Sequence, residues 1–373
     1  MPGSHESVVA DHGGHTEMLA RTLGISPEDL LDFSSNTDIL VAHLTAKIAA
    51  SIDPVLHRYP DPECVDLREA IAQYEPAQRD EVLCLSGSSE GIFLALAGLR
   101  PTKACIVAPI FSEYVRACHS LDIPSQLHVL DPGQDFRLTE QDVSALAATD
   151  ADLIVICAPC NPTGAALSNL ARLLPGLGKR TLLVDGTYHE FVHATEHHAP
   201  LSFQELKQAM PPGSRLLMLR SFTKWAACPG VRLGYALGDP GLLAELSRLQ
   251  PPWSVTQFAQ NLGQALLNRI GDFRDSRAPL HELRGNMARA LAQCPAIAHV
   301  VPSDLNFFLC RLRSGVSSQA VARELLAQHM VVRVCDNIPG LDNGGYVRIQ
   351  IRTRQDNERV TNALVGIGLD QVR

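Results

Sequence analysis

One segment decides the fold: Leu216-Leu-Met-Leu-Arg220-Ser221-Phe-Thr-Lys224-Trp-Ala-Ala-Cys-Pro-Gly230-Val-Arg232-Leu-Gly-Tyr235. Its apolar start predicts a buried strand, and the small and hydroxyl-bearing residues that follow predict a turn at the end of that strand. Lys224 stands in this turn between hydroxyl side chains, and Arg232 follows eight residues later. A partly desolvated lysine amine is a nucleophile toward an aldehyde, and hydroxyls with an arginine suit a phosphate dianion. Considered alone, however, a lysine in a turn is more often an exposed surface residue.

Further apolar runs around this segment predict an α/β domain with a mostly parallel sheet. They alternate with stretches of helical periodicity, such as Glu63–Tyr74 and Ser89–Leu99, and this spacing suits crossover helices that cover both faces of the sheet. The strands expected here are Glu81–Leu85, Ala104–Ala108, Leu153–Cys157, Thr181–Asp185, Leu216–Arg220 and Leu233–Leu237.

The chain after Pro251-Pro252 follows a different pattern, which predicts a smaller α+β domain. A long helical stretch is expected from Val255 into the 290s. Short strands are expected at Phe307–Leu312, Val331–Val334 and Val347–Arg352, with a helix at Gly315–Gln328. We therefore expect a large domain at residues 41–265, a small C-terminal domain at 266–373, and an N-terminal segment, 1–40, that packs with the small domain.

The bulk composition limits the possible functions. The chain has 373 residues, 46% of them hydrophobic and 19% charged, which is typical of a globular protein. A net charge of −8 makes nucleic acid an unfavourable partner. No apolar run approaches the roughly 20 residues that span a bilayer, so we expect no membrane association. The ten irregularly spaced cysteines favour a reducing cytoplasm over a disulfide framework, and no secretory signal is recognisable at the start.

Three further motifs are expected at the same edge of the sheet as Lys224. The turn Asn161-Pro-Thr-Gly164 follows one predicted strand, and Asp185 ends the next. In open parallel sheets this edge is where ligands bind. A buried Asp185 is suited to pair with a protonated ring nitrogen, and Tyr188 to donate to a phenolic oxygen, as pyridoxal phosphate requires. Ser86-Gly-Ser-Ser-Glu90 then opens a predicted helix, whose N–H groups and dipole can hold a phosphate.

Together, these motifs resemble the fold-type I pyridoxal-phosphate enzymes of the class I/II aminotransferase group, over nearly the whole chain. The resemblance implies that Lys224 binds the cofactor as a Schiff base, that Asp185 binds the ring nitrogen and that Phe111 stacks on the ring. It implies that Asn161 and Tyr188 contact the phenolic oxygen, and that Tyr59 reaches the phosphate of a neighbouring subunit in a homodimer. Catalysis is thereby assigned to Lys224, Asp185 and Tyr188, and phosphate binding to Ser88, Ser89, Ser221, Thr223 and Arg232.

Two regions are similar to one subgroup, the L-threonine-O-3-phosphate decarboxylases of cobalamin biosynthesis, which are relatives of histidinol-phosphate aminotransferases. They are His12-Gly-Gly-His15 with Leu31-Asp-Phe-Ser-Ser-Asn36, and Val332–Leu341 with Tyr346–Arg354. This similarity implies a small amino acid phosphate as the substrate and its decarboxylation to (R)-1-aminopropan-2-ol phosphate. The substrate residues so implied are His12, Gly13, Asn36, Asn161, Arg333 and Arg348.

The spacing of residues in the last predicted strand agrees with this assignment. Arg348, Gln350 and Arg352 share one face of a strand, and the alternate apolar residues share the other. The planar guanidinium of Arg348 suits a carboxylate, and Arg333 is suited to the substrate phosphate together with His12 and Asn36. The alternative is a pair of solvated arginines on an edge strand.

The sequence departs from the family pattern at four places. Asn36 is followed by Thr37-Asp38-Ile39-Leu40, where relatives usually have Ile-Asn-Pro-Leu-Gly. Gly186 replaces the usual acidic residue after Asp185. Thr256 stands where asparagine is typical, and Cys335-Asp336 reverses the usual Asp-Cys order. The first and the last of these departures lie at the proposed substrate site and leave the exact substrate open.

Three alternatives remain open. An aminotransferase acting on histidinol phosphate or a related acidic amine differs only in which bond at the substrate Cα is aligned. A zinc hydrolase is suggested by His189-Glu-Phe-Val-His193, which matches H-E-x-x-H, but that motif needs a helix and here follows a strand, so we expect no metal. A cofactor-binding protein without turnover is the third.

The pair Cys157-Ala-Pro-Cys160 resembles half of a zinc site. It has no second pair at zinc spacing, and we expect two core cysteines there.

Overall fold

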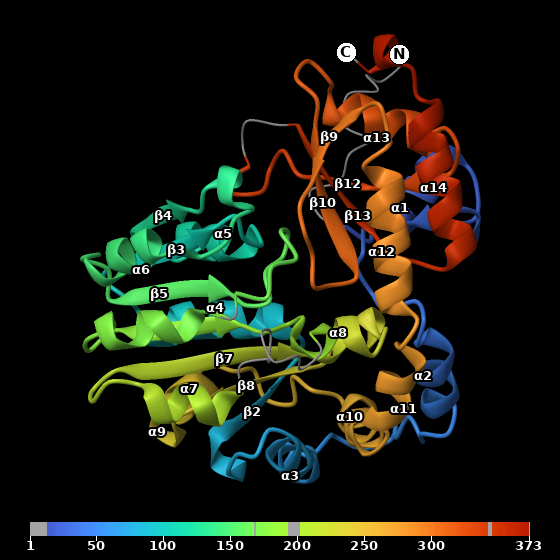
Figure 1. Cartoon of the computed structure of the whole chain (residues 1–373). Coiled ribbons are helices and arrows are strands. Elements are labelled where there is room, and N and C mark those ends of the chain that lie inside the picture. The colour runs from blue at the N-terminus through green and yellow to red at the C-terminus, as the bar shows by residue number, and fades with distance from the viewer. Residues whose placement is uncertain (1–12, 168, 193–201, 342–344, 373) are drawn as a thin grey trace, which may run out of the picture. The chain divides into compact units, whose positions relative to one another are not determined.

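A computed structural model of the chain describes residues 13–167, 169–192, 202–341 and 345–372. The contacts within the chain divide it into two compact units (Figure 1). Unit 1 contains residues 1–36, 162–164 and 278–373, and unit 2 contains residues 37–161 and 165–277. Sequence reasoning placed the divisions at 40/41 and 265/266, whereas the contacts place them at 36/37 and 277/278.

Unit 2 is built on a seven-stranded sheet of order β2-β8-β7-β6-β5-β3-β4. Strands β7, β6, β5, β3 and β4 are parallel to one another, and β8 runs antiparallel to both β7 and β2. The predicted mostly parallel sheet is therefore confirmed, with strand ends within one residue of the predicted ones. The bounds are β2 Val82–Leu85, β3 Ala104–Ala108, β4 Ser125–Val129, β5 Leu153–Cys157, β6 Thr181–Asp185, β7 Arg215–Ser221 and β8 Gly234–Gly238.

Strand β4 was not predicted from the sequence. It forms one edge of the sheet, and its side chains alternate between exposed and half-buried positions. Gln126 and His128 occupy the half-buried positions and bond to Thr149 and Asp142. Because an edge strand needs no continuous apolar run, its sequence resembles that of a polar loop.

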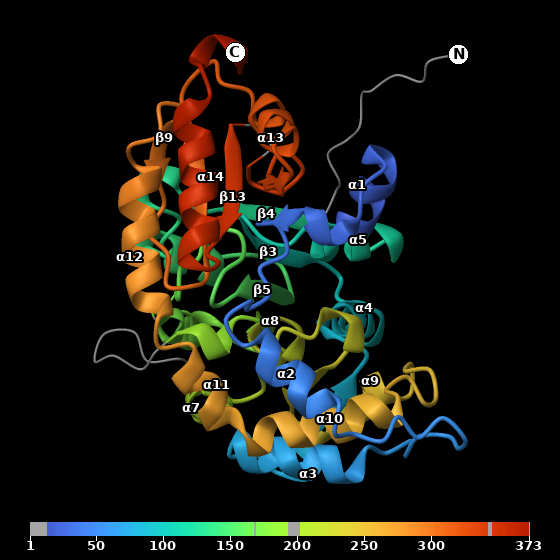
Figure 2. The same ribbon diagram turned by 90° about the vertical axis from the view of Figure 1, so that its right-hand side faces the viewer.

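Helices cover both faces of this sheet (Figures 1 and 2). Helices α4, α5 and α9 lie on one face, and α6 and α7 lie on the other. Helix α10 packs against both α3 and α2. The bounds are α2 Ala42–Ala49, α3 Val65–Tyr74, α4 Ser88–Leu99, α5 Glu113–Ser120, α6 Glu140–Ala147, α7 Phe203–Ala209, α8 Phe222–Trp225, α9 Pro240–Ser247, α10 Gln257–Asn268 and α11 Ile270–Ser276.

The long helical stretch predicted after Val255 is divided into three helices, α10, α11 and α12 (Leu280–Leu291). Arg269, with φ of −118°, separates the first two. Pro279 is the N-cap of α12, and a proline ends a preceding helix because it lacks an N–H and its ring crowds the preceding turn. The division between units, at 277/278, falls in the same short connection.

Unit 1 contains an antiparallel sheet of order β12-β13-β10-β9 and a short parallel pair, β1 with β11. Figure 2 shows α12 and α14 side by side against one face of the four-stranded sheet. The strand bounds are β1 Leu31–Asp32, β9 Ile297–Val300, β10 Phe307–Leu312, β11 Met330–Val331, β12 Arg333–Val334 and β13 Tyr346–Gln350. The helix bounds besides α12 are α1 Thr16–Leu23, α13 Ser318–Leu326 and α14 Arg354–Gly366.

The structure also describes the cysteines and the helices, from which the composition had argued against a disulfide framework and a membrane span. All ten cysteines are buried free thiols, including Cys157 and Cys160. Within the described ranges, no helix combines the length and the apolar character that a membrane crossing requires.

Two helix glycines provide a test of the packing in unit 2. A Cβ on Gly263, in α10, would lie 2.8 Å from Leu67 Cδ1 of α3 and 2.8 Å from Leu233 Cδ2. Gly263→Ala should therefore lower the free energy of unfolding by about 1–3 kcal/mol, because buried neighbours must move. A Cβ on Gly271, in α11, would meet no atom within 4 Å, so Gly271→Ala should raise that free energy by about 0.5–1 kcal/mol. Urea unfolding of both variants measures the difference, and equal effects would contradict this packing.

Candidate active site

The predicted cofactor residues of unit 2 gather where neighbouring parallel strands end. Asp185 is the last residue of β6 and Ser221 the last of β7, and Asp185 lies opposite Leu219 in the parallel pair. Asn161 follows the end of β5, whose last residue, Cys157, lies opposite Asp185. The carboxyl ends of parallel strands form the ligand-binding edge of open α/β sheets. These residues therefore lie where a cofactor is expected.

The start of α4, where Ser88 and Ser89 are the first two residues, has the features of an anion-binding turn. Gly87 is the N-cap, with φ of 81°, and a Cβ there would lie 2.5 Å from Arg232 Nη2. Glycine therefore allows the guanidinium to approach the backbone closely. A Cβ on Gly234 would lie 3.0 Å from Ser88 N, so β8 also passes close to this turn. The N–H groups and dipole of the helix start favour a phosphate, and Arg232 adds a positive charge.

Lys224 lies in α8, a one-turn helix that begins directly after β7. Ser221 caps this helix, because its Oγ accepts a hydrogen bond from the Thr223 N–H at 3.2 Å. The N–H of Phe222 donates to Leu233 O at 3.2 Å and so ties the turn to the residue before β8. The sequence therefore places Lys224 in a turn whose start is fixed by two hydrogen bonds.

Two donors hold the buried carboxylate of Asp185. Tyr114 Oη donates to Oδ2 at 3.0 Å, and the Thr187 N–H donates to Oδ1 at 3.0 Å. Burial, followed by the charge of Asp185, raises the pKa of Tyr114 far above its ordinary value, so the phenol keeps its proton and remains a donor. Thr187 Oγ1 also lies 3.4 Å from Ser88 Oγ, within hydrogen-bonding distance, and links this turn to the start of α4. A carboxylate fixed in this way suits a cationic ring nitrogen.

Sequence reasoning missed both donors to Asp185. Tyr114 had one weak signal, since it follows Phe111 by three residues and therefore lies within one helical turn of it. Thr187 had a better one, because an aspartate at a strand end commonly accepts from the backbone N–H two residues later.

The remaining predicted cofactor residues lie in different surroundings. Tyr188 is buried, and its ring centroid lies 6.0 Å from that of Phe191. Phe111 is half-buried between the end of β3 and the start of α5. Tyr59 is 76% exposed, and its ring stacks on that of Trp253 at a centroid distance of 4.6 Å. Tyr59 thus lies at the surface of this chain, as does Arg232.

The Asn161-Pro-Thr-Gly164 motif is divided between the two units. In unit 2 the N–H of Asn161 donates to Cys157 Sγ at 3.4 Å. In unit 1 the carbonyl of Gly164 accepts from the Asp304 N–H at 2.9 Å, and a Cβ on Gly164 would overlap Ser303. Within unit 2, the asparagine of the motif is thus held at the end of β5.

The predicted substrate residues that the structure describes in unit 1 centre on two buried arginines. Arg333 of β12 lies directly opposite Arg348 of β13. Arg348 Nη2 donates to Ser34 O at 2.6 Å, and its guanidinium lies 5.2 Å from the centroid of Phe307. Arg333 Nη2 donates to Asn337 Oδ1 at 2.6 Å. The two guanidinium groups thus lie among carbonyl and amide oxygens and an aromatic face.

The N-terminal segment supplies part of the lining around Arg348. Asn36 is fully buried with φ of 58°, and its amide oxygen, turned toward the guanidinium, accepts from Arg348 Nε at 3.0 Å. A Cβ on Gly13 would overlap Ser34 O, and the Gly14 N–H donates to Ser34 Oγ at 2.9 Å. The structure therefore brings Gly13, Asn36 and Arg348 close to one segment, whereas His12 lies outside the described residues.

The polar face predicted for the last strand is seen in the structure. Besides Arg348, Gln350 Oε1 accepts from the Asn36 N–H at 2.8 Å, and Arg352 Nη1 donates to Asp32 O at 3.0 Å. Arg348, Gln350 and Arg352 thus each bond to the segment between Asp32 and Asn36. This segment therefore covers the polar face of the strand.

The residues of the zinc-like motif have other partners. His189 and Glu190 lie in η5, a 3-10 turn (His189–Phe191) and not an α-helix, and Glu190 pairs with Arg274 at 3.4 Å. Burial, with the charges of neighbouring guanidinium groups, lowers the pKa of His189 well below its ordinary value. His193 lies outside the described residues. Among the residues that can be placed, no group of three or more His, Cys, Asp or Glu side chains is arranged to hold a metal ion.

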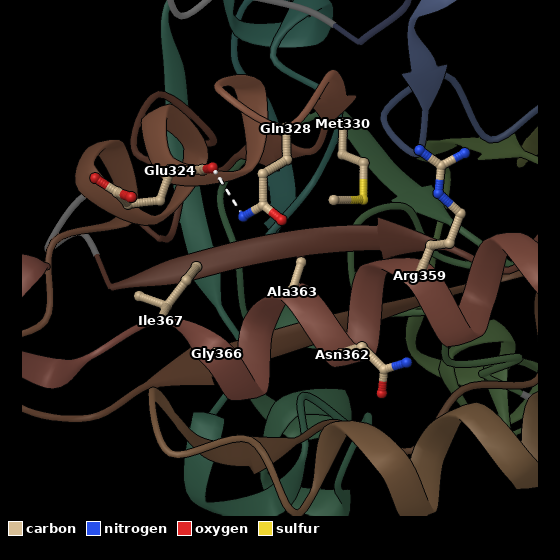
Figure 3. A pocket seen from close by; sticks show the side chains of 8 residues that line it. All are labelled: Glu324, Gln328, Met330, Arg359, Asn362, Ala363, Gly366 and Ile367. Atoms are coloured by element: carbon tan, nitrogen blue, oxygen red, sulfur yellow. Dashed lines mark hydrogen bonds between the residues drawn. The ribbon is translucent and has the colours of Figure 1, made fainter.

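An open groove between α13 and α14 lies elsewhere in unit 1 (Figure 3). Its polar lining includes Glu324, Gln328, Arg359 and Asn362, and Gln328 Nε2 donates to Glu324 O at 3.4 Å. No predicted site residue lines this groove.

The described residues of unit 2 fit pyridoxal phosphate. The turn at Gly87 suits its phosphate, the buried carboxylate suits its ring nitrogen, and Lys224 follows the adjacent strand end. A mostly parallel α/β sheet with this set of residues defines a fold-type I pyridoxal-phosphate enzyme.

Comparison with known proteins agrees with this class. The sequence model of the family "Aminotransferase class I and II" matches residues 26–364. A threonine-phosphate decarboxylase of Salmonella typhimurium is 35% identical over 366 residues, covering 95% of this chain and 95% of that protein. A histidinol-phosphate aminotransferase of Roseiflexus castenholzii is 30% identical over 364 residues, covering 93% and 92%. The crystal structure of a histidinol-phosphate aminotransferase from Clostridium acetobutylicum superposes with a TM-score of 0.78 at 26% identity, covering 90% and 98%.

The chain therefore belongs to the aminotransferase class I and II family. It is a pyridoxal-phosphate-dependent enzyme. The two similar proteins differ in reaction, since one is a decarboxylase and the other an aminotransferase.

The predicted role of Lys224 can be tested by chemical trapping. When the chain carrying pyridoxal phosphate is reduced with borohydride, mass spectrometry should find the cofactor on the peptide that contains Lys224, because only a lysine bonded to the aldehyde is trapped. Lys224→Ala should lose this label, and Lys179→Ala, which removes an exposed lysine of the same unit, should keep it. A label on another lysine in the unaltered chain would contradict the assignment.

Proposed function

We propose that this enzyme decarboxylates L-threonine O-3-phosphate to (R)-1-aminopropan-2-ol phosphate, a step of cobalamin biosynthesis. The observation that carries the proposal is the pair of buried guanidinium groups, Arg333 and Arg348, directly opposite each other in unit 1. The substrate has two acidic groups, a carboxylate and a phosphate. Guanidinium groups bind both through paired N–H donors. Two arginines therefore match the two acidic groups of this substrate.

The similarity to the Salmonella decarboxylase supports the same substrate, because it extends over 95% of both chains. The similarity to histidinol-phosphate aminotransferases supports a second candidate, transamination of a phosphorylated amine. Both candidates need a site for a phosphate. They differ in whether the carboxylate leaves as CO₂ or the amino group is transferred.

The residues of unit 2 would carry out the common part of either reaction. Pyridoxal phosphate, when bound, accepts the electron pair that a broken bond at the substrate Cα leaves behind. Asp185 would keep a proton on the ring nitrogen, with Tyr114 and Thr187 fixing its carboxylate. Tyr188 and Asn161 would contact the phenolic oxygen. Lys224 would hold the cofactor through its Nζ until the substrate's amino group displaces it, and the freed amine would then deliver a proton to the substrate Cα.

The phosphate of the cofactor would be held at the start of α4. The residues proposed for this are Ser88, Ser89, Ser221, Thr223 and Arg232, with Phe111 against the ring. Tyr59, exposed on this chain, would reach the phosphate bound by a second copy, so we propose a homodimer.

Arg348 would bind the substrate carboxylate, and Arg333 its phosphate. Asn36 and Gly13 would line the same site, and His12 would contribute from the segment before Gly13. The guanidinium that holds each acidic group would then determine how the substrate is oriented, and so which bond at Cα is aligned for breaking.

Product analysis separates the two candidates. Incubation of the chain carrying pyridoxal phosphate with L-threonine O-3-phosphate should release CO₂ and form an equal amount of aminopropanol phosphate, because the carboxylate is the group expected to leave. The bound cofactor should keep its aldehyde. Accumulation of pyridoxamine phosphate on the protein without CO₂ would contradict the decarboxylase and support the aminotransferase.

Removal of one guanidinium tests the substrate assignment. Arg333→Met should raise KM for L-threonine O-3-phosphate by about 10- to 100-fold, because a charged hydrogen-bonding partner of the phosphate is lost. L-threonine itself, which lacks the phosphate, should lose little in the variant. Arg311→Met removes an exposed arginine of β10 in the same unit and serves as the control. Steady-state kinetics with both substrates measure the effect, and an equal loss for the two substrates would argue against phosphate binding by Arg333.

A further inference from the structure

Three successive carbonyls belong to the turn that carries Lys224, and each accepts a hydrogen bond from a different place in unit 2. The Asp38 N–H donates to Lys224 O at 2.9 Å. Arg277 Nη2 donates to Trp225 O at 2.9 Å. Thr45 Oγ1, on α2, donates to Ala226 O. Because α8 is a single turn, its last carbonyls have few partners within the helix. The three donors add to the one local bond of similar length, from the Ala227 N–H to Lys224 O at 3.2 Å.

Arg277 connects this turn to the one that carries Tyr188. Its side chain is 0% exposed, and its Nη1 donates to Glu190 O at 3.0 Å. The guanidinium also lies 4.9 Å from the ring centroid of Phe191. Glu190 and Phe191 belong to η5, whose N-cap is Tyr188. One side chain thus binds backbone next to Lys224 and backbone just after Tyr188.

A buried ion pair holds Arg277 in this position. Its Nε donates to Asp38 Oδ2 at 2.6 Å, and Asp38 is only 2% exposed. Burial raises the pKa of Asp38, while the charge of Arg277 and its hydrogen bond lower it. Two buried charges are costly to separate, because removing one leaves the other without compensation. The pair therefore fixes both the guanidinium and the backbone around Asp38, which itself donates to Lys224 O.

Asp38 and Arg277 lie close to the two points where the chain passes between unit 2 and unit 1. Asp38 lies two residues after Asn36, the end of a stretch of unit 1, and Arg277 is the last residue of unit 2. The two partners are 239 residues apart. The pair thus anchors, within unit 2, both of the segments that lead out of it at 36/37 and 277/278.

We propose that Asp38, Thr45 and Arg277 are positioning residues that hold the backbone at Lys224, Trp225 and Ala226 so that the Lys224 amine points at the cofactor. This inference rests on the proposed role of Lys224. It does not depend on which substrate is used. Its alternative is that the ion pair stabilises unit 2 as a whole without a particular effect on the Lys224 turn.

Hydrogen exchange distinguishes these two roles. The test uses the full chain, with and without pyridoxal phosphate, and follows the amides of residues 224–228. Asp38→Ala removes the carboxylate, and Arg277→Lys keeps the positive charge beside Asp38 but cannot reach three acceptors with one ammonium group. Both should speed exchange in this peptide by about tenfold or more relative to the rest of unit 2.

Glu81→Ala is the matched control. Glu81 is another buried carboxylate of unit 2, and it pairs with Lys207. Its removal should lower overall stability without a selective change in residues 224–228. If Asp38→Ala and Arg277→Lys give the same uniform exchange as Glu81→Ala, the positioning role is wrong.

A second measurement follows the cofactor directly. At saturating pyridoxal phosphate, the visible absorption of the lysine-bound cofactor should appear about tenfold more slowly in Arg277→Lys than in Glu81→Ala, because the amine is less well oriented. Equal rates in the two variants would overturn the proposal. Thr45→Val, which has the same shape but lacks the donor to Ala226 O, should be slowed in the same direction, and it decides the matter if the charge variants do not fold. A missing Lys224 label in the unaltered chain would instead refute the role of Lys224.

Discussion

The parallel pairing of β5, β6 and β7 is the constraint on which the rest of the site depends. In that register Cys157, Asp185 and Leu219 lie side by side, so the strands end at one edge of the sheet. Asp185 is the last residue of its strand, and Lys224 lies three residues beyond the last residue of β7. A shift of one residue in either pair would turn Asp185 to the other face of the sheet. The position of Asp185 therefore depends on the backbone hydrogen bonds that join these three strands.

Arg220, a buried arginine of β7, lies at this edge and is held by Glu75, a carboxylate distant in the chain. Arg220 Nε donates to Glu75 Oε1 at 3.1 Å, and Tyr235 Oη donates to the same oxygen at 2.6 Å. A Cβ on Gly186 would overlap Arg220, which accounts physically for the glycine after Asp185. The carboxylate that pairs with Arg220 is that of Glu75, the C-cap of α3. The departure seen in the sequence is thus accommodated locally and leaves Asp185 with both of its donors.

The sequence could predict the parts of the site that depend on local patterns. Short apolar runs bounded by turns predicted β3, β5 and β6 with their observed ends, and Asp185 followed from its place at one of those ends. Edge strand β4 could not be found, because its half-buried side chains are polar. Tyr114 and Arg277 were missed for a different reason. Their partners, Asp185 and Asp38, are 71 and 239 residues away, and no local period carries such a pairing.

The substrate site proposed in unit 1 would come at a cost in stability of its sheet. Like charges directly opposite in an antiparallel pair repel each other, so Arg333 and Arg348 are unfavourable as a purely structural pair. Oxygens of Ser34 and Asn337 offset part of this repulsion. A bound carboxylate and phosphate would offset more, because each adds a full negative charge. The β12–β13 register then determines the spacing of the two acidic groups that the site would accept, just as the strand register in unit 2 determines the position of Asp185.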